Sequence, residues 1–217
     1  MLSGVLGATA TLFGVMVDVL FGFIIALYVL AQKEQIGRFC TRFVKAFLPE
    51  KAGNYLFYVA RVADEAFTNF VSGQLIEALI IAALCYIGMT IFGFPYALTI
   101  ATVVGFTALI PVFGAWIGAI FGALLILTVS PMKALLFLVF LVVLQQLEGN
   151  LIYPRVVGKT MGLPGLLVML AVLTGGSAFG VPGMLFSVPL CSVVYTLLKE
   201  AMAEQLKKKA FKAPHKV

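Results

Sequence analysis

The feature that most constrains this chain is a set of long apolar runs that almost lack charge. The first run, residues 2–30, contains a single charged residue, Asp18. As a helix it would be about 43 Å long, more than the roughly 30 Å hydrocarbon core of a bilayer. Charged residues make up 11% of the chain, hydrophobic residues make up 62%, and the mean hydropathy is +1.11. A soluble domain of this size has too little interior to bury so much apolar surface, so the sequence predicts an all-α, polytopic helical membrane protein.

Basic residues are concentrated in two segments, which predict the topology. Six of the 15 Lys and Arg residues lie within residues 33–61, and six lie within residues 199–216. Basic segments beside apolar runs favour the cytoplasmic side of a membrane. We expect residues 1–31 to form a transmembrane helix with its N-terminus outside. Residues 32–73 would be a cytoplasmic amphipathic segment and residues 199–217 a basic cytoplasmic tail, with no role in binding nucleic acid.

Residue types that build metal sites and hydrolytic centres are scarce. The three cysteines, Cys40, Cys85 and Cys191, are isolated, and the only histidine is His215 in the tail. This excludes a Cys/His zinc site and a histidine-based triad within the chain. Intramembrane aspartyl proteases need two aspartates, whereas Asp18 is the only aspartate in a predicted span. We expect no enzyme activity, no metal and no cofactor.

The first half of the chain is predicted to form separate helices. Apolar residues recur at helical spacing in residues 33–48, which indicates an amphipathic helix that ends at Pro49. A second helix is expected at residues 54–71. The next span is expected at residues 75–92, with Glu77 in its first turn, where the helix dipole favours an acid.

Residues 74–198 are predicted to form a transport core that contains two short, broken helical hairpins. The first hairpin pairs residues 96–110 with residues 112–129. A helix of 15 residues covers only about 23 Å, so this hairpin is re-entrant or barely spans the bilayer. After a returning span at residues 134–153, the second hairpin pairs residues 164–177 with residues 183–198. The predicted hinge and turn residues are Pro111, Gly114, Pro154, Gly162, Pro164, Gly176, Gly180, Gly183 and Pro189.

The two hairpins are related by a shift of 69 positions. This shift places residues 93–95 (Gly-Phe-Pro) on residues 162–164 (Gly-Leu-Pro), and Gly114 on Gly183. The predicted topology starts the first hairpin outside and the second inside, as in the inverted repeats of secondary transporters. The alternative is coincidence, because glycine and proline are frequent in membrane helices.

Polar side chains gather where the returning span ends. Gln145 and Glu148 are i, i+3 neighbours on a helix, and Gln146 and Asn150 are i, i+4 neighbours. In a membrane such side chains face protein or a water-filled cavity, where a carboxylate can hold a proton or a cation. The alternative is a helix that simply emerges at the cytoplasmic interface. The candidate transport residues are Glu148, Asn150, Gln145, Gln146, Arg155 in the following loop, and Asp18, which could instead be a buried structural acid.

Two segments resemble the signature region of the AI-2E family transporters. They are residues 145–164 (QQLEGNLIYPRVVGKTMGLP) and residues 175–190 (GGSAFGVPGMLFSVPL). The resemblance extends back through residues 111–114 and 72–75 to about residue 20. Ser72 stands where family members often have a basic residue. Family members normally carry further membrane segments ahead of the resembling region, so this chain resembles the C-terminal two-thirds of one.

The resemblance implies a multi-pass transporter of the bacterial inner (plasma) membrane. Its substrate would be a small polar solute such as autoinducer-2, which it exports, or Na⁺(Li⁺), which it exchanges for H⁺. The expected partners are the lipid bilayer, the transported solute or ions, and further copies of the chain. The alternative is a non-transporting scaffold or assembly protein, or an inactive transporter fragment.

Overall fold

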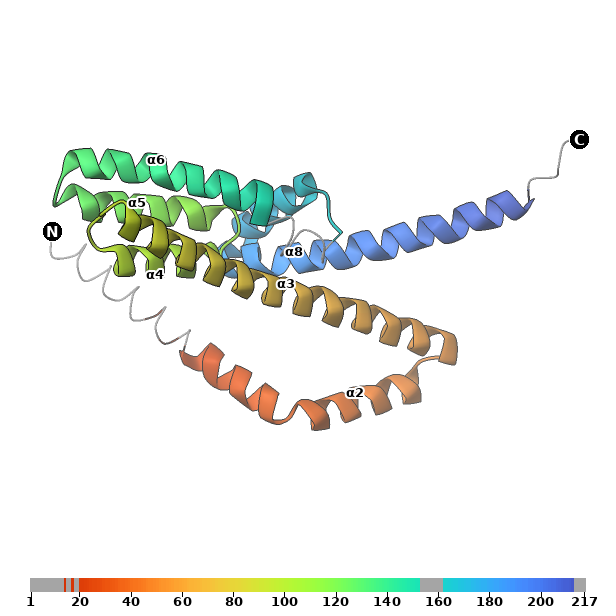
Figure 1. Cartoon of the computed structure of the whole chain (residues 1–217). Coiled ribbons are helices and arrows are strands. Elements are labelled where there is room, and N and C mark those ends of the chain that lie inside the picture. Colours follow the sequence, from red (N-terminus) through yellow and green to blue (C-terminus); the bar gives the residue numbers. More distant parts are fainter. Residues whose placement is uncertain (1–13, 15–16, 18–19, 153–161, 213–217) are drawn as a thin grey trace, which may run out of the picture. The chain divides into compact units, whose positions relative to one another are not determined.

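The computed structural model describes residues 14, 17, 20–152 and 162–212. Within these residues all regular elements are helices and there is no strand, which confirms the all-α prediction. Three helices are long and apolar enough to cross a membrane, and a bent pair that includes Leu20–Ala31 would make a fourth. The chain divides into two compact units, Met1–Phe57 and Tyr58–Val217, and the helices are labelled in Figure 1.

The first unit contains the predicted amphipathic helix. The apolar helix Leu20–Ala31 is followed at once by α2 (Lys33–Phe47), and the two are bent by 70°. Helix α2 ends just before Pro49, as its sequence predicts. Gly53, in the first turn of the next helix, lies close to Val44, because a Cβ on this glycine would lie 3.4 Å from Val44 Cγ1.

Helix α3 (Glu50–Ile91) is a single helix of 42 residues, so the prediction of two helices at residues 54–71 and 75–92 was wrong. A glycine inside a helix costs about 1 kcal/mol relative to alanine but does not break it, and no proline interrupts this segment. At 1.5 Å per residue α3 is about 63 Å long, roughly twice the hydrocarbon core. Glu77 therefore lies in mid-helix, and the interpretation of Glu77 as a residue of the first turn was also wrong.

Helices α4 (Ala97–Ala108) and α5 (Phe113–Leu127) form the first predicted hairpin. Both are too short to cross the hydrocarbon core. Their turn contains buried Pro111, and Val112 adopts a positive φ of 69°. A Cβ on Gly114 would lie 2.0 Å from the backbone oxygen of Thr107, so the two arms cross where only glycine fits.

Helix α6 (Pro131–Leu147) returns along the hairpin. Ser130 caps its N-terminus by accepting a hydrogen bond from the backbone N–H of Lys133. Lys133 Nζ also donates to the backbone oxygen of Gly93, 3.0 Å away, which joins the start of α6 to the turn before α4. The helix ends in η1 (Glu148–Ile152), a π-helical turn.

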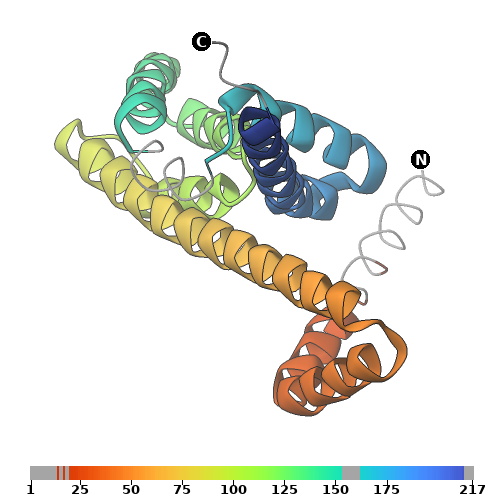
Figure 2. The same ribbon diagram turned by 90° about the vertical axis from the view of Figure 1, so that its right-hand side faces the viewer.

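Helix α8 (Gly165–Lys212) contains the second hairpin, whose two arms appear in teal and blue in Figure 2. The backbone breaks at Gly180, with φ 63° and ψ −143°. Gly176 was predicted to break the helix, but it is helical in the first arm. A Cβ on Gly183 would lie 2.0 Å from the backbone oxygen of Gly175, so the arms cross at a pair of glycines.

Helix α8 continues through most of the basic tail, to Lys212. The sequence of this segment is rich in Ala, Glu, Gln, Leu and Lys, which are strong helix formers, and it contains no proline before Pro214. An i, i+4 ion pair between Glu204 and Lys208 adds a small stabilisation on the exposed surface.

The two hairpins share the features that the 69-residue shift predicts. Gly93 and Gly162, which precede them, both have a positive φ, at 66° and 59°. Gly114 and Gly183 both lie where the two arms of a hairpin cross. In Figure 1 the α4–α5 hairpin and the α8 hairpin enter the second unit from opposite ends, and their turns lie near its middle. These correspondences favour an inverted repeat over coincidence.

Two apolar clusters hold the second unit together, and α3 contributes to both. The larger cluster joins α3 to α4, α5 and α6, with Cys85, Met89, Ile100, Ile126 and Phe137 fully buried. The smaller cluster joins Phe70 of α3 to both arms of α8 through Val172 and Val188. Phe113, at the turn of the first hairpin, packs against this smaller cluster.

Candidate functional site

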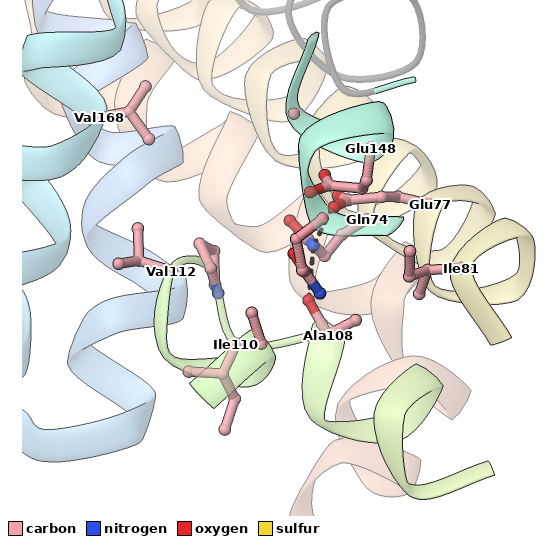
Figure 3. Close-up of a pocket in the computed structure, with 12 residues that line it drawn as sticks. Gln74, Glu77, Ile81, Ala108, Ile110, Val112, Glu148 and Val168 are labelled. Carbon is pink, nitrogen blue, oxygen red and sulfur yellow. Dashed lines mark hydrogen bonds between the residues drawn. The ribbon is translucent and has the colours of Figure 1, made fainter. Parts of the chain in front are cut away.

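A pocket of about 240 Å³ lies where the two hairpins meet α3 and the end of α6 (Figure 3). Four elements line it: α3, the α4–α5 turn with the start of α5, the α6–η1 junction and the first arm of α8. Most of the lining is apolar, and the polar side chains are those of two glutamines and two glutamates. The lining residues are Gln74, Glu77, Ile81, Ala108, Ile110, Pro111, Val112, Ala115, Gln145, Glu148, Gly149 and Val168.

Gln74 and Glu77 bring two polar side chains from the middle of α3. They are one helical turn apart, and only 4% of Gln74 and 6% of Glu77 is exposed. Gln74 Nε2 donates to Glu77 Oε2 and to the backbone oxygen of Ala108, each 2.9 Å away. The amide therefore links Glu77 to the C-terminal end of α4.

The other end of the Gln74 amide is left without a partner. Gln74 Oε1 is buried and accepts no hydrogen bond within the described part of the chain. An unpaired buried acceptor costs about 1–3 kcal/mol. Gln74 itself lines the pocket, so a hydrogen-bond donor that reached this oxygen would remove the cost.

Glu148 brings a second carboxyl group next to that of Glu77 (Figure 3). It is the first residue of η1 and is half-buried, and its carboxyl group interacts directly with that of Glu77. Figure 3 shows the two carboxyl groups side by side, with Gln74 next to them. Two neighbouring carboxylates repel each other when both are ionised. The pair can therefore hold a proton or a cation between the two carboxyl groups.

The turn of the first hairpin provides backbone groups at the same place. The C-terminal end of α4 carries the negative end of the helix dipole, and one of its last carbonyls, that of Ala108, meets Gln74. Irregular backbone inside a membrane is tolerated only where protein or a cavity covers it. Pro111 and Val112 line the pocket, so the break in the hairpin forms part of the site.

The structure separates the polar residues that the sequence grouped at the end of α6. Glu148 and Gln145 line the pocket. Gln146 and Asn150 are exposed, and Asn150 Nδ2 donates to the backbone oxygen of Gln146 at 2.9 Å and to its Oε1 at 3.2 Å. The predicted i, i+4 contact is present, but it lies away from the pocket.

Three predicted residues, Asp18, Pro154 and Arg155, lie outside the described residues. Of the predicted hinge residues, Pro111 lines the pocket. Fully buried Pro189 borders a second, apolar pocket of about 270 Å³ between α3 and the second arm of α8. Pro164 immediately precedes α8, and Gly180 breaks it.

Sequence reasoning missed Gln74 and Glu77 as site residues. A signal for them was present, because the spacing Gln-x-x-Glu occurs both at residues 74–77 and at residues 145–148. In the structure both Gln-x-x-Glu pairs line the same pocket. A repeated pair of rare polar residues in two apolar helices indicates that the helices face each other, since neither pair is stable against lipid.

Comparison with known proteins identifies relatives over most of the chain. The family model described as AI-2E family transporter matches residues 1–203. YueF of Bacillus subtilis (strain 168), named "Putative transport protein YueF", is 30% identical over 185 residues, which are 85% of this chain and 50% of that protein. "Putative transport protein YrrI" of the same organism is 33% identical over 138 residues, which are 64% of this chain and 39% of that protein.

A more distant relative carries a different description. "Putative permease PerM" of Escherichia coli (strain K12) is 26% identical over 190 residues, which cover 81% of this chain and 49% of that protein. The chain thus spans about half the length, or less, of these curated relatives. No solved structure matches it.

Proposed function

This chain belongs to the AI-2E family of transporters, and we propose that it moves a small polar solute or a cation across the membrane through the pocket between its hairpins. The observation that carries the proposal is the meeting of the two Gln-x-x-Glu pairs at the turn of a broken hairpin. Polar and ionisable groups are expensive inside a membrane, and where they occur they mark ion and substrate pathways. In secondary transporters such sites lie at the interface of repeats and at broken helices.

We assign the coupling role to Glu148 together with Glu77. When both carboxyl groups are ionised their repulsion favours uptake of a proton or a small cation, and loss of that ion restores the repulsion. Glu148 lies in a π-helical turn, and turns of this kind are frequent at functional sites. The pair can therefore alternate between a loaded and an unloaded state, which coupled transport requires.

The chemistry of the lining supports two classes of substrate. The two carboxyl groups and Gln74 Oε1 are acceptors, so the pocket suits ligands that bring hydrogen-bond donors or positive charge. A small polyhydroxylated solute of the autoinducer-2 kind fits the first class, and Na⁺ or Li⁺ exchanged for H⁺ fits the second. Anionic solutes are disfavoured, because the described lining carries no positively charged side chain.

The proposed setting is the bacterial inner membrane, with the C-terminal tail in the cytoplasm. Two clusters of basic residues support this orientation through the positive-inside rule. The alternative is a scaffold, an assembly protein or an inactive transporter fragment. A buried and incompletely satisfied polar site favours transport, since a scaffold has no need of it.

The test is solute and ion flux in proteoliposomes, comparing the wild type with Glu148→Gln. Glutamine keeps the size of the side chain and most of its hydrogen-bonding capacity but cannot take up a proton or carry a charge. We expect Glu148→Gln to abolish coupled flux and its dependence on external pH, while the protein stays folded. Autoinducer-2 and Na⁺/H⁺ exchange are measured in parallel, with this chain alone and with the chain extended by N-terminal membrane segments of the kind that family members carry.

Asp18→Asn is the comparison variant, because Asp18 is the single acid of the apolar run at residues 2–30. We expect the larger loss at Glu148. Wild-type flux with wild-type pH dependence in Glu148→Gln would end its role as the coupling residue. A collapse of the melting temperature in detergent would instead make Glu148 a structural residue.

A further inference from the structure

Helix α2 in the first unit presents an exposed row of phenylalanine side chains. Phe39, Phe43 and Phe47 follow at intervals of four, and their ring centroids are 6.4 Å and 4.8 Å apart. Their side chains are 70%, 51% and 74% exposed. So much exposed aromatic surface on one face of a helix is normally covered by another molecule or by lipid.

Basic side chains lie beside this row. Arg38, Arg42 and Lys45 recur at intervals of three and four, which places them together on the face next to the phenylalanines. All three are exposed, and the ion pair of Arg38 with Glu34, at 3.7 Å, is itself open to solvent. The basic residues are therefore free to approach phosphate groups while the phenylalanines lie in apolar surroundings.

The bend before α2 determines how the helix meets a membrane. The apolar helix Leu20–Ala31 makes an angle of 70° with α2. Membrane helices tilt by about 20° from the bilayer normal on average, so α2 lies within roughly 40° of the membrane plane. The bend also coincides with the change from apolar residues to Gln32 and Lys33, which is where a spanning helix leaves the hydrocarbon core.

We propose that α2 is an interfacial anchor, with Phe39, Phe43 and Phe47 inserted below the headgroups of an anionic leaflet and Arg38, Arg42 and Lys45 bound to lipid phosphates. The bilayer is the occupant because a span at residues 20–31 places its apolar side chains in lipid, and only Gln32 separates this helix from α2. An amphipathic helix with a basic polar face and an aromatic apolar face has the composition that binds anionic membrane surfaces. A second copy of the chain would offer the phenylalanines a partner but would leave the basic face unneutralised.

The proposal is tested by the depth of a single tryptophan in the full chain. Trp116→Phe removes the only tryptophan, and Phe43→Trp then places one in the aromatic row. In vesicles that contain phosphatidylglycerol, lipids brominated on their acyl chains should quench it at least about twofold more strongly than the tryptophan of Lys45→Trp in the same background. Circular dichroism and gel filtration check that both variants are folded, and both positions are exposed, so neither substitution disturbs a core.

The charges are tested in the same assay. Adding Arg38→Gln and Arg42→Gln to the Phe43→Trp protein should reduce its quenching in phosphatidylglycerol vesicles to the level in pure phosphatidylcholine vesicles. Equal quenching at positions 43 and 45 would overturn the proposal. So would an unquenched, blue-shifted emission at position 43 that depends on the protein-to-lipid ratio, because it would assign the phenylalanine face to contact between copies.

Discussion

At the scale of single residues, the site depends on two acids held at one pocket by different means. Glu77 is fixed by Gln74, whose amide also holds the end of α4. Glu148 lies in a π-helical turn, which is a less regular and more easily rearranged backbone than an α-helix. We infer that Glu77 is the stationary member of the pair and that Glu148 is the member that moves when the ion is exchanged.

Glu77→Gln should reduce coupled flux by about tenfold or more, equivalent to about 1.4 kcal/mol. The variant keeps the shape of the side chain but leaves Glu148 without an acidic partner with which to share an ion. Removing one buried acid also removes repulsion, so the melting temperature in detergent should be unchanged or higher. Glu65→Gln is the matched control, since Glu65 is an exposed acid on the same helix. Undiminished, pH-dependent flux in Glu77→Gln would exclude the paired mechanism.

At the scale of elements, both hairpins depend on glycine where their arms cross. In α8 the arms approach so closely that the backbone oxygens of Gly175 and Gly183 each occupy the space of a Cβ on the other residue. Close backbone approach of this kind is typical of helix pairs in membranes, where small residues replace the hydrophobic driving force. The second hairpin is therefore a rigid unit, and we expect it to move as one body during transport.

Gly183→Ala should destabilise the protein by about 1–3 kcal/mol, because the added methyl group forces the two arms apart. Gly37→Ala in α2 is the matched control, since a Cβ there meets nothing within 4 Å. Alanine at position 37 should leave stability unchanged or raise it by up to about 1 kcal/mol. Melting temperatures in one detergent measure both effects, and equal values for the two variants would contradict the tight crossing.

At the scale of the whole molecule, the first prediction concerns orientation in the membrane. A Lys207→Cys variant should resist an impermeant thiol reagent added outside intact cells, whereas Met132→Cys, in the first turn of α6, should react with it. The positive-inside rule places the tail in the cytoplasm and the α5–α6 turn outside. Cys40 and Cys191 are replaced by alanine in both variants, while Cys85 is fully buried and stays. Labelling at position 207 from outside would reverse the orientation.

The second prediction at this scale concerns assembly. The small-residue stripe Gly114, Gly118 and Gly122 is used within the chain, against Thr107, Val104 and Phe137, so contacts between copies must lie on other surfaces. The resemblance to the family favours a homo-oligomer, with the exposed apolar face of α6 as one surface available for it. Light scattering in mild detergent should therefore give a protein mass above one chain of 23.3 kDa. A monodisperse species with the mass of one chain would count against assembly.

The class of the protein, its short hairpins and the pocket residues of α6 and η1 could be predicted from the sequence alone. These features depend on local information: the length of an apolar run, the position of a proline, and the spacing of side chains along one helix. For this reason the breaks at Pro111 and Gly180, the amphipathic helix α2 and the pairing of Gln145 with Glu148 could all be predicted.

The part of the site on α3 and the continuity of that helix follow from the tertiary structure. The sequence around Glu77 is the same whether Glu77 caps a helix or lies buried within one. Its place in the site depends on contacts with distant residues: Glu148, 71 positions away, interacts with it directly, and Ala108 does so through Gln74. Likewise, Gly73 disfavours the helix locally by about 1 kcal/mol relative to alanine, and α3 stays unbroken there because the segments on either side of it are held in separate apolar clusters with α4 to α6 and with α8. Burial is a property of the assembled helices, so the chemistry of a buried carboxyl group follows from the fold and not from its neighbours in the chain.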